Sequence, residues 1–221
     1  MSEPADTTGD RALCFFGRIT ASISHELKNV LAIINENAGL MDDLAMLAVQ
    51  GLPVEPERLK TISERIGFQV RRADGILRNM NAFSHSVDDR VKTVDLGEVV
   101  SLVTALSARL AAMRGVTLAA SPPDSSVPVT TSPFLLQNLI FHCIDFATKR
   151  CGEGGRIDVR TGRGEAGDGV VTFRGLTTLG REDAEKLSTE QQMELLAEVH
   201  ARITGNEAAE ELILSVTGQK Q

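Results

Sequence analysis

The sequence predicts an α+β protein: a long antiparallel helical hairpin that forms a dimeric four-helix bundle, followed by a small α/β sandwich. Apolar residues recur in steps of three and four from residue 10 to about residue 50, and again from residue 59 to residue 83. Beyond residue 90 the pattern changes to short strands and helices separated by glycine-rich turns. We therefore place one domain at residues 1–90 and a second at residues 91–221.

The first helix is predicted by a mostly apolar stripe that continues for more than four heptads. Thr20 and Asn37 are its polar interruptions. The stripe consists of Leu13, Phe16, Thr20, Ile23, Leu27, Val30, Ile34, Asn37, Met41, Leu44 and Ala48. The segment GLPVEPE at residues 51–57 ends this pattern, and Pro56 suits the first turn of a new helix.

A second helix is predicted by a further stripe after this break. It consists of Leu59, Ile62, Ile66, Val70, Ala73, Leu77, Met80 and Phe83. Two long amphipathic helices joined by a short loop form a hairpin. Because a lone hairpin cannot cover both of its apolar stripes, we expect a homodimer in which two hairpins form a four-helix bundle.

The second half of the chain predicts about four strands and three helices. The helices are expected from a capping box at Asp95–Glu98 through Leu110, from Ser132-Pro133 through residue 150, and from Ser188 to His200. The strands are expected at residues 116–120, 156–161, 170–176 and 211–217. This alternation is typical of a compact α/β sandwich.

Composition excludes several classes of function. The 221 residues include no Trp and no Tyr, and the net charge is −7, so neither nucleic acid nor an anionic membrane is an expected partner. No apolar run approaches the roughly 20 residues that a membrane-spanning helix needs. The three cysteines and four histidines show no metal-ligand spacing, so we expect no metal site. We expect a soluble, cytoplasmic protein.

The candidate functional residue is His25, in the stretch ITASISHELKNVLAIINENAGL at residues 19–40. It falls on the helix face farthest from the apolar stripe, among mostly small side chains. Neutral imidazole is a competent nucleophile at cellular pH. Glu26 could accept a hydrogen bond from its Nδ1–H, Asn29 could hold a phosphoryl oxygen or a water, and Lys28 could offset negative charge. A single exposed histidine is more often merely solvated, so a functional role for His25 depends on the residues around it.

Those neighbours resemble a known family. The motif SHELKN around His25 resembles the phosphoacceptor helix of two-component sensor histidine kinases, with Val30 where the family usually has proline. ILRNMNAFSH resembles the end of the family's second dimerisation helix, and VDLGEVVSLV and PFLLQNLIFHCIDFA resemble the start of its ATP-binding domain. The resemblance covers about residues 12–217. It implies that His25 is phosphorylated, that Glu26 is its acid/base partner and that Asn29 tunes transfer or hydrolysis.

The resemblance fails where the family binds nucleotide. His142 stands where family members use an asparagine for the metal, and Cys143 replaces the usual alanine. An imidazole is a poor substitute for an amide oxygen on Mg²⁺, and we favour His142 as a packed surface residue. Arg174 stands where the family's aspartate reads adenine, which reverses the charge. EQQMELLAEVHARITG, at residues 190–205, replaces the family's glycine-rich phosphate cover.

One further motif formally matches a nucleotide-binding pattern. Residues 162–167, GRGEAG, fit GxGxxG. That motif holds phosphate when it leads into the N-terminus of a helix. Here it joins two predicted strands, so we interpret it as a hairpin turn.

These features predict a histidine phosphotransferase that passes phosphoryl groups between His25 and receiver-domain aspartates without using ATP. In organisation the chain is most similar to stand-alone histidine phosphotransferases. The expected partners are response-regulator receiver domains and a second copy, with an upstream hybrid histidine kinase as a further candidate. We expect no cofactor on this chain and Mg²⁺ on the receiver. The alternatives are a pseudokinase that binds, scaffolds or dephosphorylates a response regulator, and a divergent active kinase.

Overall fold

The computed structural model describes residues 8–123, 125–177, 190–206 and 210–218. The chain divides into two compact units, Thr20–Asn81 and Met1–Ile19 with Ala82–Gln221. Both ends of the predicted hairpin domain, residues 1–19 and 82–90, are thus grouped with the second half of the chain. The predicted α+β class is confirmed. The domain assignment at residue 90 stays a prediction.

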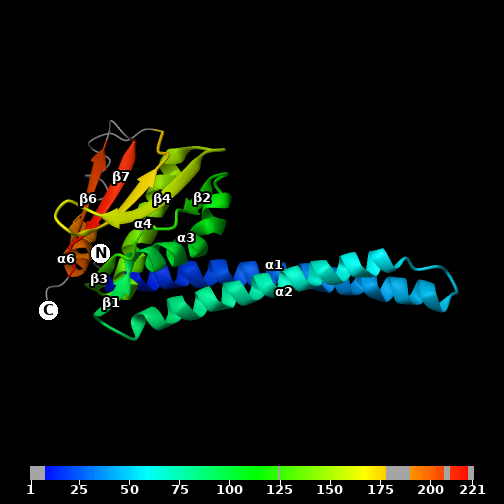
Figure 1. The fold of residues 1–221 in the computed structure, drawn as a ribbon. Helices are drawn as coiled ribbons and strands as arrows, with labels where there is room; N and C mark the ends of the chain where they lie inside the picture. The colour runs from blue at the N-terminus through cyan, green and yellow to red at the C-terminus, as the bar shows by residue number, and fades with distance from the viewer. Residues whose placement is uncertain (1–7, 124, 178–189, 207–209, 219–221) are drawn as a thin grey trace, which may run out of the picture. The chain divides into compact units, whose positions relative to one another are not determined.

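The unit Thr20–Asn81 consists of the greater parts of two long helices and the loop between them. Helix α1 spans Thr8–Val49 and α2 spans Pro56–Ser84, and the two are antiparallel neighbours (Figure 1). Both elements predicted from the apolar stripes are therefore confirmed. Within Thr20–Asn81 the buried apolar side chains are Ile23, Val30, Leu44 and Ile62, and Asn37 is buried among them.

Helix α1 is uninterrupted at Val30. A proline at this position, as in the family that the sequence resembles, would remove one backbone hydrogen bond and clash with the preceding turn. Val30 keeps its N–H and is fully buried. The helix therefore continues through the segment that follows His25.

The remaining helices and strands belong to the other unit. Its helices are α3 (Leu96–Ala112), α4 (Pro133–Cys151) and α6 (Glu190–Val199), with a short 3₁₀ turn η1 at His85–Val87. Its strands are β1 (Lys92–Asp95), β2 (Thr117–Ala120), β3 (Pro128–Thr131), β4 (Arg156–Arg163), β5 (Gly169–Arg174), β6 (Ala201–Asn206) and β7 (Glu211–Val216). The helix predicted at Ser188–His200 lies partly outside the described residues.

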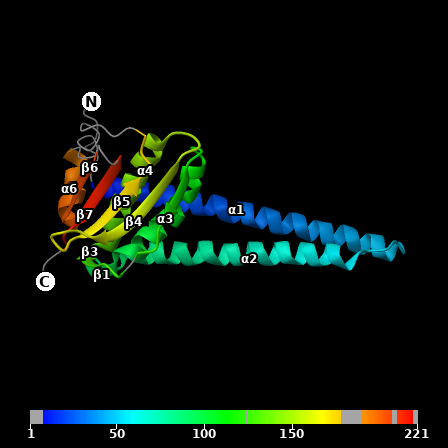
Figure 2. The same cartoon turned by 45° about the horizontal axis from the view of Figure 1, so that its top comes forward.

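The strands form two sheets. Strands β1 and β3 pair antiparallel in a small sheet, and the larger sheet has the order β2-β4-β5-β7-β6 (Figure 2). Only the β2–β4 pair is parallel, and the other pairs of the large sheet are antiparallel. Seven strands are thus present among the described residues, where the sequence predicted about four. Strands β1, β3 and β6 were missed.

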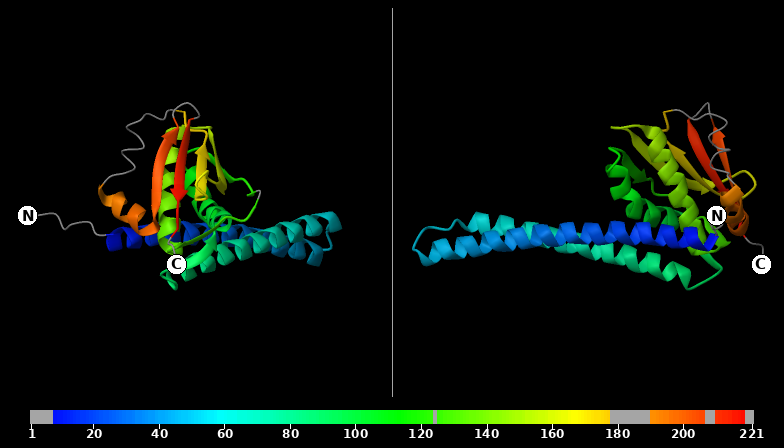
Figure 3. Two further views of the ribbon diagram at one scale, coloured as in Figure 1. Left: turned by 60° about the vertical axis from the view of Figure 1, so that its left-hand side comes forward. Right: turned by 180° about the vertical axis from the view of Figure 1, so that it is seen from behind.

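Helices α3 and α4 cover one face of the large sheet (Figure 3). Burial alternates along the strands, as expected where one face is packed and the other is wetter. Ile157, Val171 and Leu214 point into the core and are fully buried. The unit is therefore a two-layer α/β sandwich, as predicted.

The start of α3 is set by a local cap. Asp95 accepts hydrogen bonds from the backbone N–H groups of Gly97 and Glu98, as the predicted cap requires. It also accepts bonds from the Ser126 hydroxyl and the Val127 N–H. The Ser126 bond and the backbone bonds together outweigh burial and lower the pKa of the Asp95 carboxyl. One carboxylate thus fixes α3 to the segment before β3.

A phenylalanine cluster joins the ends of the two long helices to α4 within the same unit. Phe83, at the end of α2, packs edge-on against Phe15 of α1 at 5.4 Å and stacks on Phe16 at 5.3 Å. Phe15 also contacts Phe134 and Phe141 of α4. Phe15, Phe83 and Phe141 are at most 3% exposed. This cluster explains why residues 8–19 group with the sandwich.

The GRGEAG segment is a hairpin turn, as predicted. Strand β4 ends at Arg163, which pairs with Gly169 at the start of β5. The N–H of Gly164 donates to the carbonyl of Asp168 at 2.8 Å, and Gly167 adopts a positive φ of 82°. No helix follows the turn, so it lacks the helix N-terminus that a phosphate site of this kind needs.

Candidate functional site

His25 lies in the middle of α1, and its side chain is exposed. Ile23 and Val30, on the opposite side of the helix, are buried. The apolar stripe thus turns one face of α1 inward and leaves His25 on the outward face, as the heptad position predicted.

Two of the other predicted site residues share the face of His25. Lys28 and Asn29 are three and four residues further along, the spacing at which helical side chains are neighbours, and both are exposed. Ala21 and Ala32 are also exposed on this face and are small. The imidazole is therefore surrounded by one cation, one amide and little steric bulk.

Glu26 is placed differently. It is half-buried, and as the next residue along it points about 100° around the helix from His25. Among the described residues, no hydrogen bond joins Glu26 to the His25 ring, the contact through which Glu26 could have oriented the imidazole. Neighbouring side chains at i and i+1 do not face each other on a helix, which is the physical reason. The assignment of Glu26 as acid/base partner stays a prediction.

His142 lies on α4, in the other unit. It is half-buried and its ring packs edge-on against Phe141, with centroids 6.1 Å apart. His142 therefore has the packed position that we predict from the sequence.

An ionic cluster on α4 was not anticipated from the sequence. The carboxylate of Asp145 accepts hydrogen bonds from Arg114 at 2.8 Å and Arg18 at 3.1 Å, and pairs with Lys149 at 2.8 Å. Arg114 also donates to the Asp145 carbonyl and to the Thr148 hydroxyl. The i,i+4 spacing of Asp145 and Lys149 was a visible signal, but nothing in the sequence pointed to Arg18 or Arg114.

These contacts define the charge state of Asp145. Burial acts to raise the pKa of its carboxyl, but the bonds from Lys149 and Arg114 outweigh burial and hold the pKa well below its usual value. Three cations already surround this carboxylate. A hard dication such as Mg²⁺ prefers several free oxygen ligands, so this part of α4 does not suit it.

We expect Asp145→Asn to lower the free energy of unfolding by about 2 kcal/mol at pH 7, a figure reduced by solvent screening of the exposed partners. A carboxyl whose pKa is depressed by folding stabilises the protein above its ordinary pKa of 3.8 and loses that effect as the pH falls further. Urea unfolding of both proteins at pH 7, 5, 4 and 3 should show their difference shrinking only below about pH 4.

Asp158→Asn is the matched control, because Asp158 pairs with one exposed arginine, Arg156. Asp158→Asn should lower the free energy of unfolding by about 0.5 kcal/mol or less. An Asp145→Asn variant as stable as the control at pH 7 would contradict the structural role of the cluster.

Arg174 is held within the sheet. It ends β5 and forms an ion pair with Glu211 of β7, which lies opposite it in the register. The next residue, Gly175, has a φ of 98°, and a Cβ there would lie 2.1 Å from the Arg156 carbonyl oxygen. The backbone turn after β5 therefore requires glycine, while the charge of Arg174 is directed to a neighbouring strand.

The possible metal ligands and the cysteines were compared among the described residues. There, no group of three or more His, Cys, Asp or Glu side chains is arranged to hold a metal ion. Cys14 is exposed, whereas Cys143 and Cys151 are buried, and none forms a disulfide. Burial raises the pKa of the Cys143 thiol to about 12, which leaves it unreactive at neutral pH.

Among the helices that the structure describes, none combines the length and the apolarity that crossing a membrane requires.

Comparison with known proteins finds similarity in structure alone. No family model and no curated protein matches the sequence. Solved structures that align with the chain include the Acinetobacter baumannii histidine kinase AdeS, at 12% identity over 89% of this chain and 98% of that one, with a TM-score of 0.46. A bacterial phosphotransferase aligns at 14% identity over 97% and 98% of the two chains, with a TM-score of 0.46.

A third structure is histidine kinase ThkA in complex with the response regulator protein TrrA. It aligns at 16% identity over 94% of this chain and 63% of that one, with a TM-score of 0.46. At these identities and TM-scores, the neighbours identify no activity for this chain.

Proposed function

We propose that this chain is a histidine phosphotransferase of a two-component phosphorelay, located in the cytoplasm and acting without ATP. The observation that carries the proposal is the exposed His25 on the outward face of α1, with Lys28 and Asn29 beside it. That face matches the SHELKN motif through which the sequence resembles sensor histidine kinases. A second copy and receiver domains are the proposed partners.

The transfer needs little from the chain besides a positioned imidazole. The Nε2 lone pair of His25 attacks the phosphorus of a receiver aspartyl phosphate in line, an N–P bond forms, and the P–O bond to the aspartate carboxylate breaks. Nδ1 keeps its proton, and the electron pair of the broken bond stays on the aspartate. Docking makes this step effectively unimolecular. The reverse reaction passes the group to a second receiver, and we propose that the receiver supplies Mg²⁺.

The other unit supports the ATP-independent part of the proposal. Arg174, at the place of the family's adenine-reading aspartate, pairs with Glu211, and the Asp145 carboxylate of α4 is paired with three cations rather than free to hold Mg²⁺. His142, at the place of the family's metal-binding asparagine, packs against Phe141. We propose that this sandwich serves as a docking surface and supports the hairpin.

One observation favours the alternative of a scaffolding pseudokinase. Activated nucleophiles usually have a hydrogen-bond partner that fixes their orientation and protonation. Among the described residues, the His25 ring has no such partner. A protein that only binds a receiver would not need such a partner.

A transfer assay separates these functions. Receiver domains encoded in the same genome would be phosphorylated with radiolabelled acetyl phosphate, purified and mixed with this chain. We expect acid-labile, base-stable label to move to the chain, and no label from γ-labelled ATP with Mg²⁺. Release of inorganic phosphate would indicate a phosphatase, binding without transfer would indicate a scaffold, and label from ATP would indicate a kinase.

Asn29→Asp should slow transfer from the receiver about tenfold, because a carboxylate beside His25 repels the incoming phosphoryl group. Single-turnover transfer rates would measure the effect. Asn35→Asp makes the same change at an exposed position about 9 Å further along α1, and should leave the rate unchanged. An unchanged rate in the Asn29 variant would remove this residue from the mechanism.

A further inference from the structure

The outward face of the large sheet carries an excess of positive charge. Along β4, β5, β7 and β6, every second side chain points away from the packed core, and these side chains are half-buried or exposed. The charged residues among them are Arg156, Asp158, Arg160, Arg174, Arg202 and Glu211. Four arginines thus share this face with two carboxylates, in a chain whose net charge is −7.

The strand register determines how these arginines are spaced. One row across the four strands consists of Arg160, Thr172, Ile213 and Thr204. Arg202 belongs to the next row on this face, where it lies opposite Ser215. Neighbouring strands are about 4.8 Å apart and two residues of a strand rise about 6.8 Å, so the Cα atoms of Arg160 and Arg202 are about 16 Å apart. Short side chains occupy the space between them.

Two of the four arginines are neutralised within the face, and two are not. The two carboxylates of the face pair with Arg156 and Arg174. Among the residues that the structure describes, Arg160 and Arg202 form no ion pair, and both are exposed. A guanidinium holds its donors in a planar fork that binds a carboxylate through two parallel hydrogen bonds. The face therefore offers two separate groups for binding carboxylates.

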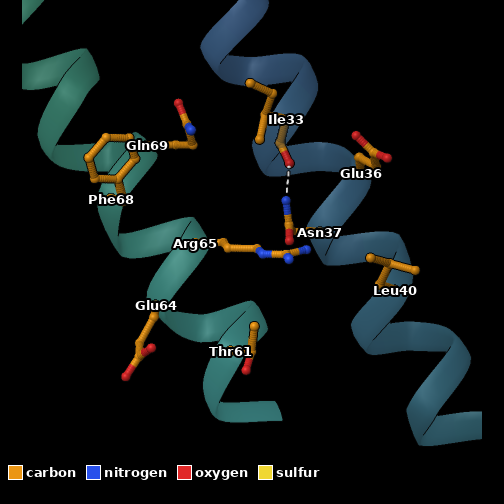
Figure 4. Close-up of a pocket in the computed structure, with 9 residues that line it drawn as sticks. All are labelled: Ile33, Glu36, Asn37, Leu40, Thr61, Glu64, Arg65, Phe68 and Gln69. Carbon is orange, nitrogen blue, oxygen red and sulfur yellow. Dashed lines mark hydrogen bonds between the residues drawn. The ribbon is translucent and has the colours of Figure 1, made fainter. Parts of the chain in front are cut away.

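A groove between α1 and α2, in the other unit, lacks this excess of cations. Arg65 reaches toward Asn37 there (Figure 4). Glu36 and Glu64 line the same groove. An acidic ligand would meet two carboxylates beside Arg65, so of these two surfaces the sheet face is the one that matches an acidic ligand in charge.

We propose that the outward face of the large sheet binds an acidic segment of a partner protein through Arg160 and Arg202. Each guanidinium takes one carboxylate, and the short side chains between them let the segment lie against the sheet. This inference goes beyond the proposed function, because it requires no phosphoryl group on His25.

A nucleic acid or an anionic membrane fits this face less well. Both would extend beyond the face, and the rest of the chain is more acidic than the whole because the face itself is positive. The outward positions of these four strands also carry no aromatic ring on which bases could stack.

The inference is tested by fluorescence anisotropy of the full chain with a labelled octaglutamate peptide at low salt. We expect the wild type to bind the peptide. Arg160→Glu/Arg202→Glu should raise the dissociation constant about tenfold or more, because two attractive charge pairs become repulsive. Arg160→Gln/Arg202→Gln should raise it less, and this neutral pair keeps the test valid if the glutamates perturb the sheet.

Arg58→Glu/Arg90→Glu is the matched control. Both arginines are exposed and lie outside the large sheet, and the double change gives the chain the same net charge as the double glutamate variant of the sheet face. It should change the dissociation constant by less than about twofold, because salt screens distant exposed charges. In the wild type, the peptide should shift the amide resonances most at Thr172, Thr204 and Ile213.

Three results would overturn the inference. The first is a wild type that does not bind the peptide, and the second is an equal loss of binding in the control and the sheet variants. The third is binding to a short oligothymidylate or to phosphatidylserine vesicles at least as tight as binding to the peptide, which would assign the face to nucleic acid or membrane. The assay contains no phosphoryl donor, so its outcome is independent of whether His25 accepts phosphate.

Discussion

Replacing His25 with glutamine should abolish phosphoryl acceptance, lowering the transfer rate from a phosphorylated receiver by about a thousandfold or more. Glutamine keeps a polar side chain of similar size but has no nucleophilic nitrogen lone pair. Because position 25 is exposed, the change should alter the free energy of unfolding by no more than about 0.5 kcal/mol. The measurement is acid-labile label on the chain, with the phosphorylated peptide identified by mass spectrometry.

His85→Gln is the matched control for this experiment. His85 is also highly exposed, and its Nδ1 pairs with Asp88 at 2.8 Å, which orients the ring. The control should accept phosphate at the wild-type rate. Label that persists in the His25 variant and disappears in the His85 variant would move the phosphoacceptor to His85. Equal labelling of all three proteins would exclude both residues.

Phe83→Ala should lower the free energy of unfolding of the sandwich unit by about 3–5 kcal/mol. Phe83 is 1% exposed, and its ring contacts Phe15, Phe16 and Phe134. Removing it leaves a cavity where the ends of α1 and α2 meet α4, and the three neighbouring rings lose contact area. Urea unfolding of both proteins at one fixed protein concentration would measure the loss.

Two variants control for the change of side chain itself. Phe83→Leu keeps most of the apolar volume and should cost less than about 1.5 kcal/mol. Phe146→Ala removes a half-buried ring that lies outside the cluster and contacts Arg150. A Phe83→Ala variant no less stable than Phe146→Ala would mean that the cluster does not hold these elements together.

Much of the fold could be predicted because it depends on local periodicity. The steps of three and four over α1 and α2 and the cap at Asp95 are properties of neighbouring residues, and all are present. Strands β1 and β3 were missed because each has only four residues and they pair with each other across more than thirty residues of sequence, as Lys92 does with Thr131. Strand β6 was missed although it is as long as β5 and pairs with the next strand, β7. Strand pairing depends on the partner strand more than on propensity.

Some features of the candidate site could likewise be predicted from the sequence, and others could not. The exposure of His25, Lys28 and Asn29 follows from their position on the helix face, which the sequence contains. A hydrogen bond from His25 to Glu26, which the sequence allows, is absent among the described residues because consecutive helical side chains do not face each other, and the role of Glu26 stays a prediction. The partners of Asp145 come from residues 18, 114 and 149, and no local pattern connects the first two with it.

The sequence by itself determined the long hairpin, the sandwich and the outward face that carries His25, because helical periodicity and capping act over a few residues. Only the tertiary structure decided that Asp145 and Arg174 form ion pairs. It also decided that the side-chain oxygens of Asn37 and Gln69 are buried without a hydrogen-bond partner. These outcomes depend on which distant side chains folding brings within a few ångströms. Desolvation and hydrogen bonding then set the charge and the remaining bonding capacity of each group.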